Sequence, residues 1–382
     1  MKNKAMNEFP LLNEDEGIPL FYPHIPDGAA AEVVDTLSGR WIGQGPKVDK
    51  FESEIKHKFL GSCEALSVGS GTDALHLAYL LAGVTAGDEV IVPVFTCTAT
   101  NLPLLYIGAK PVFVDIDPET FNLNVNDIEH RITDKTKAIV CVDYGGVPND
   151  YEALKNICDK HGLKLISDGA HAMGTKYKNE YACQIPDFTI FSFQAIKTLT
   201  TGDGGLLVIK DPNLLSLGKK LRWFGIDREA KQGGIWENDI VDIGYKYQMN
   251  DISAAIGLAG LKEIDGIISH RNALFKSYQD LLNSDRVRLI GLSQTEEYFN
   301  SAWLVTIIVD KDRVGLMNRL RDNNIESAQV HYRNDRYSVF NGRKADLPNM
   351  DNLEDRYLVL PLHTRINEDH VKDICNIINA GW

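Results

Sequence analysis

The chain has 382 residues, of which 44% are hydrophobic and 24% charged, a composition typical of a folded globular protein and not of a disordered one. Its formal net charge of −13 argues against nucleic acid and anionic membranes as general partners, because both require a basic surface. At this length we expect one large domain and one smaller domain.

The cysteines and the first residues indicate the compartment. The six cysteines are scattered without a C-x-x-C pair, so we expect neither a zinc site nor a disulfide framework. The opening segment "MKNKAMNEFPLLNEDEG" lacks the apolar core of a signal peptide. No stretch approaches the roughly 20 apolar residues that a membrane-spanning helix needs. We therefore expect a cytoplasmic protein that contains no metal.

The first half of the chain alternates strand and helix patterns between residues 67 and 209. The expected strands are short and β-branched: "DEVIVPVFT" (88–96), "AKPVFVDI" (109–116), "KAIVCVDY" (137–144) and "LKLISD" (163–168). The expected helices between them are "TDALHLAYLLAG" (72–83), "NDIEHRIT" (126–133) and "DYEALKNICDKHG" (150–162). This alternation predicts an α/β fold with a mostly parallel sheet between helices, which binds ligands at the carboxyl ends of its strands.

The second half predicts a separate C-terminal unit. A helix-rich connection over residues 250–282 is followed by an expected strand, helix, strand and helix at 301–310, 313–324, 325–332 and 368–381. We expect three parts: an N-terminal arm (1–20), a large α/β domain (21–264) and a small α+β domain (265–382).

Three motifs of the large domain contain residue types that ligand chemistry requires. In "GSGTDAL", Thr72 stands where a helix N-cap belongs, and a helix start binds anions, although a capped helix alone explains the pattern equally well. Asp168 ends a strand, with His171 three residues later; a buried carboxylate needs a cation or hydrogen bonds, but both residues are also common in turns. Lys197 lies between apolar residues and a Gly-rich turn, where desolvation makes an amine lose its proton more readily.

Together these motifs match the requirements of pyridoxal phosphate. Its phosphate needs a helix N-terminus, its ring nitrogen needs an aspartate, and its aldehyde needs a lysine amine for a Schiff base. The chain offers the helix start, Asp168, Ser192 of "FSF" and Lys197 in that order. Each part is weak evidence alone, whereas the ordered set is specific.

The chain resembles the DegT, DnrJ, EryC and StrS group of sugar aminotransferases, within the fold type I pyridoxal-phosphate enzymes. The resemblance runs from "LSGRWIGQGPKVDKFE" (37–52) to "LPLHTRINEDHV" (360–371) and includes "GSGTDALHLA", "ISDGAHAMGT" and "FSFQAIKTLTTGDGG". It implies a seven-stranded type of sheet and a homodimer in which the partner's loop "GYKYQMND" completes the phosphate site. The implied cofactor contacts are Gly71, Thr72, Asp73 and Ser192 at the phosphate, Asp168 at the ring nitrogen, His171 near the phenolic oxygen, Lys197 at the aldehyde, and Gln248 or, second, Lys246 from the partner.

One position departs from this group. Relatives commonly stack an aromatic side chain on the cofactor ring in a "T-aromatic-x-x-T" stretch, whereas this chain has "TCTAT" with Cys97 at the stacking position. A thiol covers less of the ring, so we expect weaker stacking without a change of reaction type. Simple packing of Cys97 is a better explanation than any redox role.

The resemblance also implies the reaction, which is transfer of an amino group from L-glutamate to a nucleotide-linked keto-sugar. Expected substrate contacts are Trp41 as a lid residue and, in "HYRNDRY", His331 and Arg333, with Arg336 nearby, although a solvated charged loop explains that segment equally well. His171 favours amination at C4 of a 4-keto-6-deoxy sugar, with C3 as the alternative. Lys197 argues against the dehydratase branch; a non-catalytic regulator and an amino-acid aminotransferase are the weaker alternatives.

Overall fold

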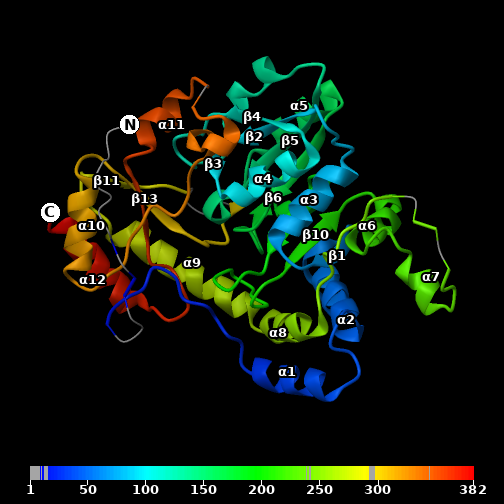
Figure 1. Cartoon of the computed structure of the whole chain (residues 1–382). Helices are drawn as coiled ribbons and strands as arrows, with labels where there is room; N and C mark the ends of the chain where they lie inside the picture. Colours follow the sequence, from blue (N-terminus) through cyan, green and yellow to red (C-terminus); the bar gives the residue numbers. More distant parts are fainter. Residues whose placement is uncertain are drawn as a thin grey trace.

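A seven-stranded sheet forms the centre of the molecule (Figure 1). The computed structural model describes residues 9, 11–12, 16–237, 239–240, 242–291, 297–343 and 345–382. All strands of the sheet run parallel except β10, which is antiparallel to both of its neighbours. In spatial order the strands are β1 (Glu64–Val68), β10 (Gly205–Ile209), β9 (Phe188–Ser192), β6 (Lys164–Asp168), β5 (Thr136–Val142), β2 (Glu89–Pro93) and β4 (Lys110–Val114). The α/β class and the mostly parallel sheet are therefore confirmed.

Helices cover both faces of this sheet because alternate strand residues point to opposite sides. In β2, Val90 and Val92 pack into one hydrophobic cluster and Ile91 into another, and all three are fully buried. One face is covered by α3 (Gly71–Leu81), α4 (Thr98–Ile107) and α6 (Leu215–Arg222). The other face is covered by α2 (Pro46–Ile55), α5 (Tyr151–His161) and α8 (Asp251–Leu261), with α1 (Ala29–Ser38) packed on α8.

The C-terminal part is built on a second, antiparallel sheet. The long helix α9 (Ile264–Leu281) leads into it (Figure 1). The sheet consists of β11 (Val287–Leu289), β13 (Val305–Val309) and β15 (Tyr357–Leu360), and nearby helices are α10 (Arg313–Arg321), α11 (Pro348–Leu353) and α12 (Glu368–Asn379). The boundary between residues 264 and 265 stays a prediction, and α9 begins at that point. Part of the predicted arm lies outside the described residues.

Two short strand pairs join the C-terminal part to the large domain. One pairs β14 (Tyr332–Arg333) with β3 (Phe95–Thr96), and the other pairs β12 (Tyr298–Phe299) with β7 (Lys176–Tyr177), which also pairs with β8 (Glu180–Tyr181). The first pair brings residues around 331 to the end of β2.

Three local predictions were wrong. Residues 126–133 form two 3-10 turns (Val125–Asp127 and Glu129–Arg131) where we expected a helix, and the extended backbone of Ile132 (φ −72°, ψ 133°) ends the segment. Residues 325–331 make isolated bridges at Ile325 and Ala328 and no regular strand, and Tyr332 begins β14. The third strand of the second sheet is β15, which sequence analysis did not assign. The N-cap of α3 is Ser70, and Thr72 lies inside the helix.

Candidate active site

The N-terminus of α3 forms an open backbone cradle beside the ends of β9 and β10. Ser70 caps the helix by accepting a hydrogen bond from the Asp73 amide at 3.1 Å. A Cβ atom at Gly71 would lie 3.0 Å from Cβ of Ser192, and one at Gly205 would lie 2.7 Å from the Gly71 amide nitrogen. Because glycine occupies both positions, three segments meet around the first turn of α3, where the amides of Gly71 and Thr72 precede the amide that Ser70 caps, and this arrangement suits a phosphate.

The loop that carries Lys246 and Gln248 lies next to this cradle within the same chain. Gln248 bridges to Val68 at the end of β1, and the Gly69 amide donates to the Tyr247 carbonyl at 2.7 Å. With its amide oriented to accept, Gln248 receives hydrogen bonds from Lys246 Nζ and from the Trp223 indole nitrogen. The contribution of this loop to a partner's site stays a prediction.

Asp168 is fixed at the carboxyl end of β6. Its carboxylate accepts a hydrogen bond from Thr100 Oγ1 at 2.7 Å and another from the Ala170 amide at 3.1 Å. Burial raises the pKa of Asp168, while these two hydrogen bonds and the charge of Lys197 oppose that rise. Sequence analysis missed Thr100, which lies in the first turn of α4 and contacts the hydroxyl of Thr96 in β3 at 2.7 Å.

Lys197 lies in the loop that connects the antiparallel neighbours β9 and β10. The loop backbone is held at both ends, since the Phe193 amide donates to Gly204 and the Thr201 amide donates to Phe193. Burial lowers the pKa of Lys197 to about 8, and the nearby Asp168 and Cys97 act in the opposite direction. The sequence prediction of a sequestered lysine is consistent with this environment.

Two histidines from distant segments meet beside Lys197. The Nε2 atoms of His171 and His331 lie 3.4 Å apart, and the rings are nearly parallel at 6°. Burial lowers the pKa of both histidines, so both are neutral near pH 7. The Gly145 amide donates to His171 Nδ1 at 3.4 Å, which places the remaining proton of His171 on Nε2, facing His331.

Arg333 does not reach this site, so its predicted substrate contact is corrected. Its guanidinium is 1% exposed and makes two hydrogen bonds of 2.7 Å to Asp335. It also pairs with Asp351 and lies 3.6 Å from Glu354. The side chain is therefore buried, and its charge is matched by three carboxylates, so it is not free to bind a diphosphate.

Two further predicted residues are accessible. Cys97 is exposed at the N-cap position of α4 and near enough to Lys197 to influence its pKa. Trp41 is 42% exposed and packs against the Gly45 backbone, which Asp251 holds by a hydrogen bond of 2.8 Å. Arg336 is exposed as well and lies over the ring of Tyr332.

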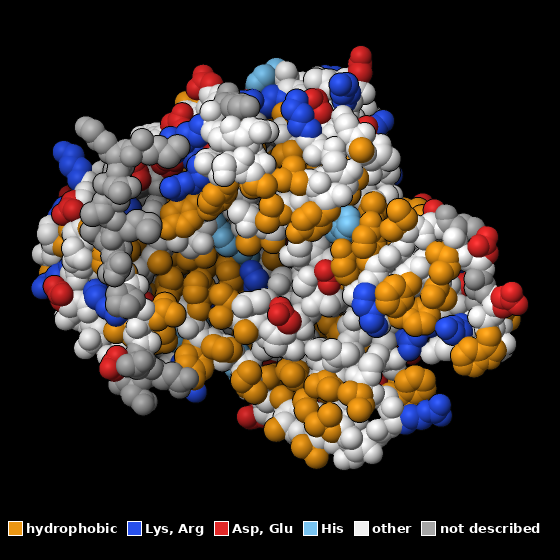
Figure 2. All heavy atoms as spheres, viewed as in Figure 1, with side chains coloured by type: hydrophobic (Ala, Val, Ile, Leu, Met, Phe, Trp, Pro, Cys, Tyr) orange, Lys and Arg blue, Asp and Glu red, His pale blue; other side chains and the backbone are white. Residues whose placement is uncertain are grey.

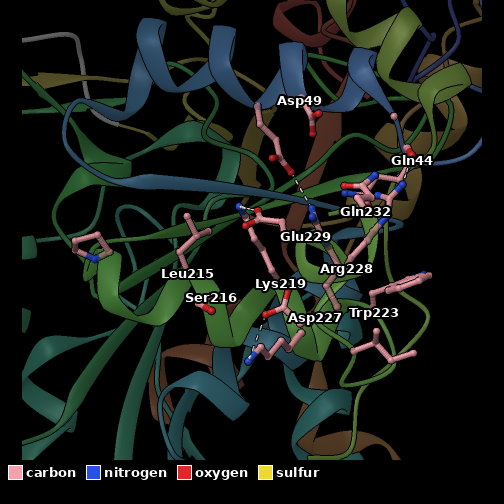
Figure 3. Close-up of a pocket in the computed structure, with 16 residues that line it drawn as sticks. Gln44, Asp49, Leu215, Ser216, Lys219, Trp223, Asp227, Arg228, Glu229 and Gln232 are labelled. Atoms are coloured by element: carbon pink, nitrogen blue, oxygen red, sulfur yellow. Dashed lines mark hydrogen bonds and ion pairs between the residues drawn. The ribbon is translucent and has the colours of Figure 1, made fainter. Parts of the chain in front are cut away.

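A separate cavity of about 350 Å³ lies between α2, α6 and α7 (Arg228–Gln232) (Figure 3). Its basic side chains are largely paired with carboxylates of the same cavity, in the pairs Lys219–Glu229, Lys220–Asp227 and Arg222–Glu52. None of its lining residues belongs to the group around Lys197. Figure 2 shows a different hollow, between the C-terminal part and the large domain, with hydrophobic walls and basic and histidine side chains inside.

The residues around Lys197 fit pyridoxal phosphate. The glycine-lined cradle at α3 accommodates a phosphate, the buried carboxylate of Asp168 can pair with a protonated ring nitrogen, and Lys197 supplies an amine that is partly neutral near pH 8. Among the described residues, no group of three or more His, Cys, Asp or Glu side chains is arranged to hold a metal ion, and no helix is long and apolar enough to span a membrane.

Comparison with known proteins identifies the family. Residues 23–379 match the model of the DegT/DnrJ/EryC1/StrS aminotransferase family. The chain is 35% identical over 369 residues to GDP-perosamine synthase of Escherichia coli O157:H7, covering 96% of this chain and 98% of the relative. The PLP form of the putative sugar aminotransferase Spr1654 from Streptococcus pneumoniae superposes with a TM-score of 0.89 at 29% identity, covering 95% of this chain and 98% of the other. DesI, solved in the presence of its TDP-sugar product, gives a TM-score of 0.86 at 26% identity, covering 97% and 94%.

The fold, the cradle at α3 and these matches agree with one another. The chain belongs to the DegT/DnrJ/EryC1/StrS aminotransferase family and is a pyridoxal-phosphate-dependent transaminase that acts in nucleotide-sugar amino transfer.

Proposed function

We propose that this enzyme transfers the amino group of L-glutamate to C4 of a nucleotide-linked 4-keto-6-deoxy sugar, with Lys197 as the covalent attachment point of the cofactor. The observation that carries the proposal is the meeting of Lys197, Asp168 and a neutral His171 beside the cradle at α3. Two relatives, GDP-perosamine synthase and DesI with its TDP-sugar product, support the substrate class.

The protein side of the mechanism follows from the positions of these groups. Pyridoxal phosphate supplies an aldehyde that condenses with amines and a ring that accepts electrons from the adjacent carbon. Lys197 would hold the cofactor through its ε-amine. Once released, that amine would serve as the proton carrier at Cα of the donor, since a pKa of about 8 lets it both give and take a proton near neutral pH. Asp168, kept in place by Thr100, would pair with the ring nitrogen and keep it protonated.

The phosphate contacts divide between two parts of the chain. In this proposal the amides of Gly71, Thr72 and Asp73 and the hydroxyl of Ser192 bind the phosphate, and Gln248 or Lys246 of a partner closes the site. Support comes from the first-turn amides of Gly71 and Thr72 and from the close approach of Gly71 to Ser192, whereas the Asp73 amide is bonded to the Ser70 side chain and would have to exchange that bond for the phosphate.

The ring and the sugar are contacted by other residues. Cys97, at the start of α4, would lie against the ring and cover it less than an aromatic side chain does. His171 would lie beside the phenolic oxygen, and its contact with His331 would bring the C-terminal segment to the substrate side of the site. Trp41 would cover the substrate from the loop before α2. C4 amination rests on His171 and is a proposal of ours.

The proposed assembly is a homodimer. Exposed hydrophobic side chains gather over α1 and over the segment after α7, and Figure 2 shows apolar patches in both regions. The most exposed are Val34 and Leu37 on α1 and Ile235, Trp236 and Ile243 after α7, with Ile243 81% exposed. Exposed apolar groups of this kind support a protein–protein interface. We propose a second copy of the chain as the partner, because the loop at 246–248 would then complete the phosphate site of the other copy.

An absorbance titration tests the function. The purified chain with pyridoxal phosphate should show a visible band that moves to the near-ultraviolet when glutamate is added, and the correct keto-sugar nucleotide should restore it. Lys197→Ala should lose turnover by at least about a thousandfold, because both covalent attachment and proton transfer depend on its amine. Lys164→Ala, at an exposed lysine on β6, is the control and should behave as wild type. Appreciable turnover in Lys197→Ala, or a band that ignores glutamate, would contradict the proposal. A screen of 3-keto and 4-keto acceptors decides the position of amination.

A further inference from the structure

Trp303 contacts the Lys197 side chain and the backbone of the residue before it. The Lys197 Nζ atom lies 3.8 Å from the centroid of the indole ring, well inside the range of a cation–π interaction. The indole nitrogen also donates a hydrogen bond of 3.2 Å to the carbonyl of Ile196, the residue before the lysine. Trp303 is 2% exposed and Lys197 is partly buried, so the contact is shielded from bulk water on the indole side.

The chain accepts backbone strain to place this tryptophan. Ala302 has a φ of +55°, which costs a residue with a side chain of the order of 1 kcal/mol. The Trp303 amide donates to the Gly145 carbonyl at 2.8 Å, and Arg271 of α9 donates to the Trp303 carbonyl at 3.3 Å. Strain that is stabilised from both the large domain and α9 points to a position that matters beyond packing.

We propose that Trp303 is a positioning residue whose indole face holds the ε-amine of Lys197 whenever that amine is not joined to the cofactor. This inference rests on the proposed role of Lys197. During transamination the lysine must leave the cofactor and then act at a fixed point, yet a free lysine side chain has four rotatable bonds and would sample many positions. A fixed aromatic surface limits that search while leaving the amine free to react, because a cation–π contact forms no covalent bond.

The other groups near the Lys197 amine are less suited than the Trp303 indole to hold it in place. Asp168 attracts the ammonium, but its oxygens already accept hydrogen bonds from Thr100 and Ala170. His171 and His331 are neutral near pH 7 and repel the ammonium when protonated. Among the residues that the structure describes, the titratable groups that interact with this amine include Asp168, Cys97, His171 and His331.

The test measures the acidity of one lysine in the cofactor-free, full-length chain. Competitive labelling with acetic anhydride across pH 6–11, read by mass spectrometry of the peptide containing Lys197, gives the pKa of that amine. Trp303→Leu removes the aromatic face and should lower this pKa by about half a unit to one unit, a three- to tenfold change in the equilibrium constant. Trp303→Phe retains a ring but not the indole N–H and should lie between Leu and wild type.

Three outcomes are possible, and each decides the proposal. A lower pKa in the order wild type, Phe, Leu supports it. An unchanged pKa in Trp303→Leu, or a higher one because water enters, overturns it. Circular dichroism checks that each variant is folded, and the Phe variant serves if the Leu variant does not fold. Failure of this inference can be told apart from failure of the proposed function. If Lys197 is not the cofactor lysine, the visible band survives in Lys197→Ala. The labelling of Lys197 in the Trp303 variants is a separate measurement and is made without cofactor.

Discussion

Gly205 is the residue at which one methyl group has the largest expected effect on cofactor binding. It begins β10 directly against the start of α3, and a Cβ atom there would lie 2.7 Å from the Gly71 amide nitrogen, a contact with backbone that cannot rotate away. An alanine side chain at this position would displace the first-turn amides of α3, which face the proposed phosphate.

We therefore expect Gly205→Ala to weaken pyridoxal phosphate binding by at least tenfold and to lower the free energy of unfolding by about 3 kcal/mol, as overpacking against backbone does. Gly266→Ala is the matched control, because Gly266 lies in α9 with open space around its Cβ position. That change should raise stability by about 0.5–1 kcal/mol through helix propensity. Cofactor titration and urea unfolding measure both effects; equal behaviour of the two variants would show that the cradle is not tightly packed.

Sequence analysis located some site residues and not others for a physical reason. Asp168, His171 and Lys197 lie at strand ends or in a loop beside the sheet, and order along the chain is enough to predict that they meet. Thr100 and Trp303 act through contacts between segments far apart in sequence, and local pattern carries no signal for such contacts. Arg333 was assigned to the substrate because its charge was visible in the sequence, whereas its carboxylate partners became visible only in the fold.

At the scale of elements, β14 depends on a buried ion pair. Arg333 is 1% exposed and Asp335 is buried with it, and this pair secures the short strand that places His331 beside His171. The segment before it was predicted as a regular strand and is irregular, while β15 was missed, although β2, β4, β5 and β6 were predicted correctly. Strands buried in a parallel sheet have a continuous apolar pattern, whereas segments fixed by side-chain ion pairs do not.

Removing one member of the buried pair should be costly. Asp335→Asn is expected to lower the free energy of unfolding by about 2–4 kcal/mol, because it leaves a guanidinium buried without its main counter-charge. Asp351→Asn, at a carboxylate that is 49% exposed, is the control in the same network and should cost less than about 1 kcal/mol. Denaturant unfolding of both variants at pH 7.5 measures the difference. Similar losses for the two would argue that Arg333 relies equally on all its partners.

At the scale of the whole molecule, each active site of the proposed dimer should contain residues from both chains. A chain with Lys197→Ala lacks the amine but carries an intact loop, and a chain with Gln248→Ala carries the amine but lacks the loop side chain. In a mixed dimer one site combines the intact residue of each chain. Mixing equal amounts after mild dissociation should therefore restore up to about a quarter of wild-type activity, since half of the dimers are mixed and each has one complete site.

The control is a mixture of Lys197→Ala with Lys246→Ala, which shows whether the neighbouring residue is the one supplied across the interface. Light scattering checks that dimers form in every mixture. No recovery in either mixture, with dimers present, would place the loop in the site of its own chain, where the contact between Gln248 and Val68 already brings it close.

The direction of β10 has a consequence for how this lysine can change during evolution. Because β9 and β10 are antiparallel neighbours, residues 193–204 form a loop that is closed at its base by the paired residues Ser192 and Gly205. Both ends of the loop are fixed, so the insertion or deletion of one residue would have to be absorbed within the loop. Such a change would move the Lys197 amine away from both the Trp303 indole and Asp168. We therefore expect the length of this loop to vary less among related proteins than its amino-acid composition. A related protein with a longer or shorter loop would need its reactive lysine at another position.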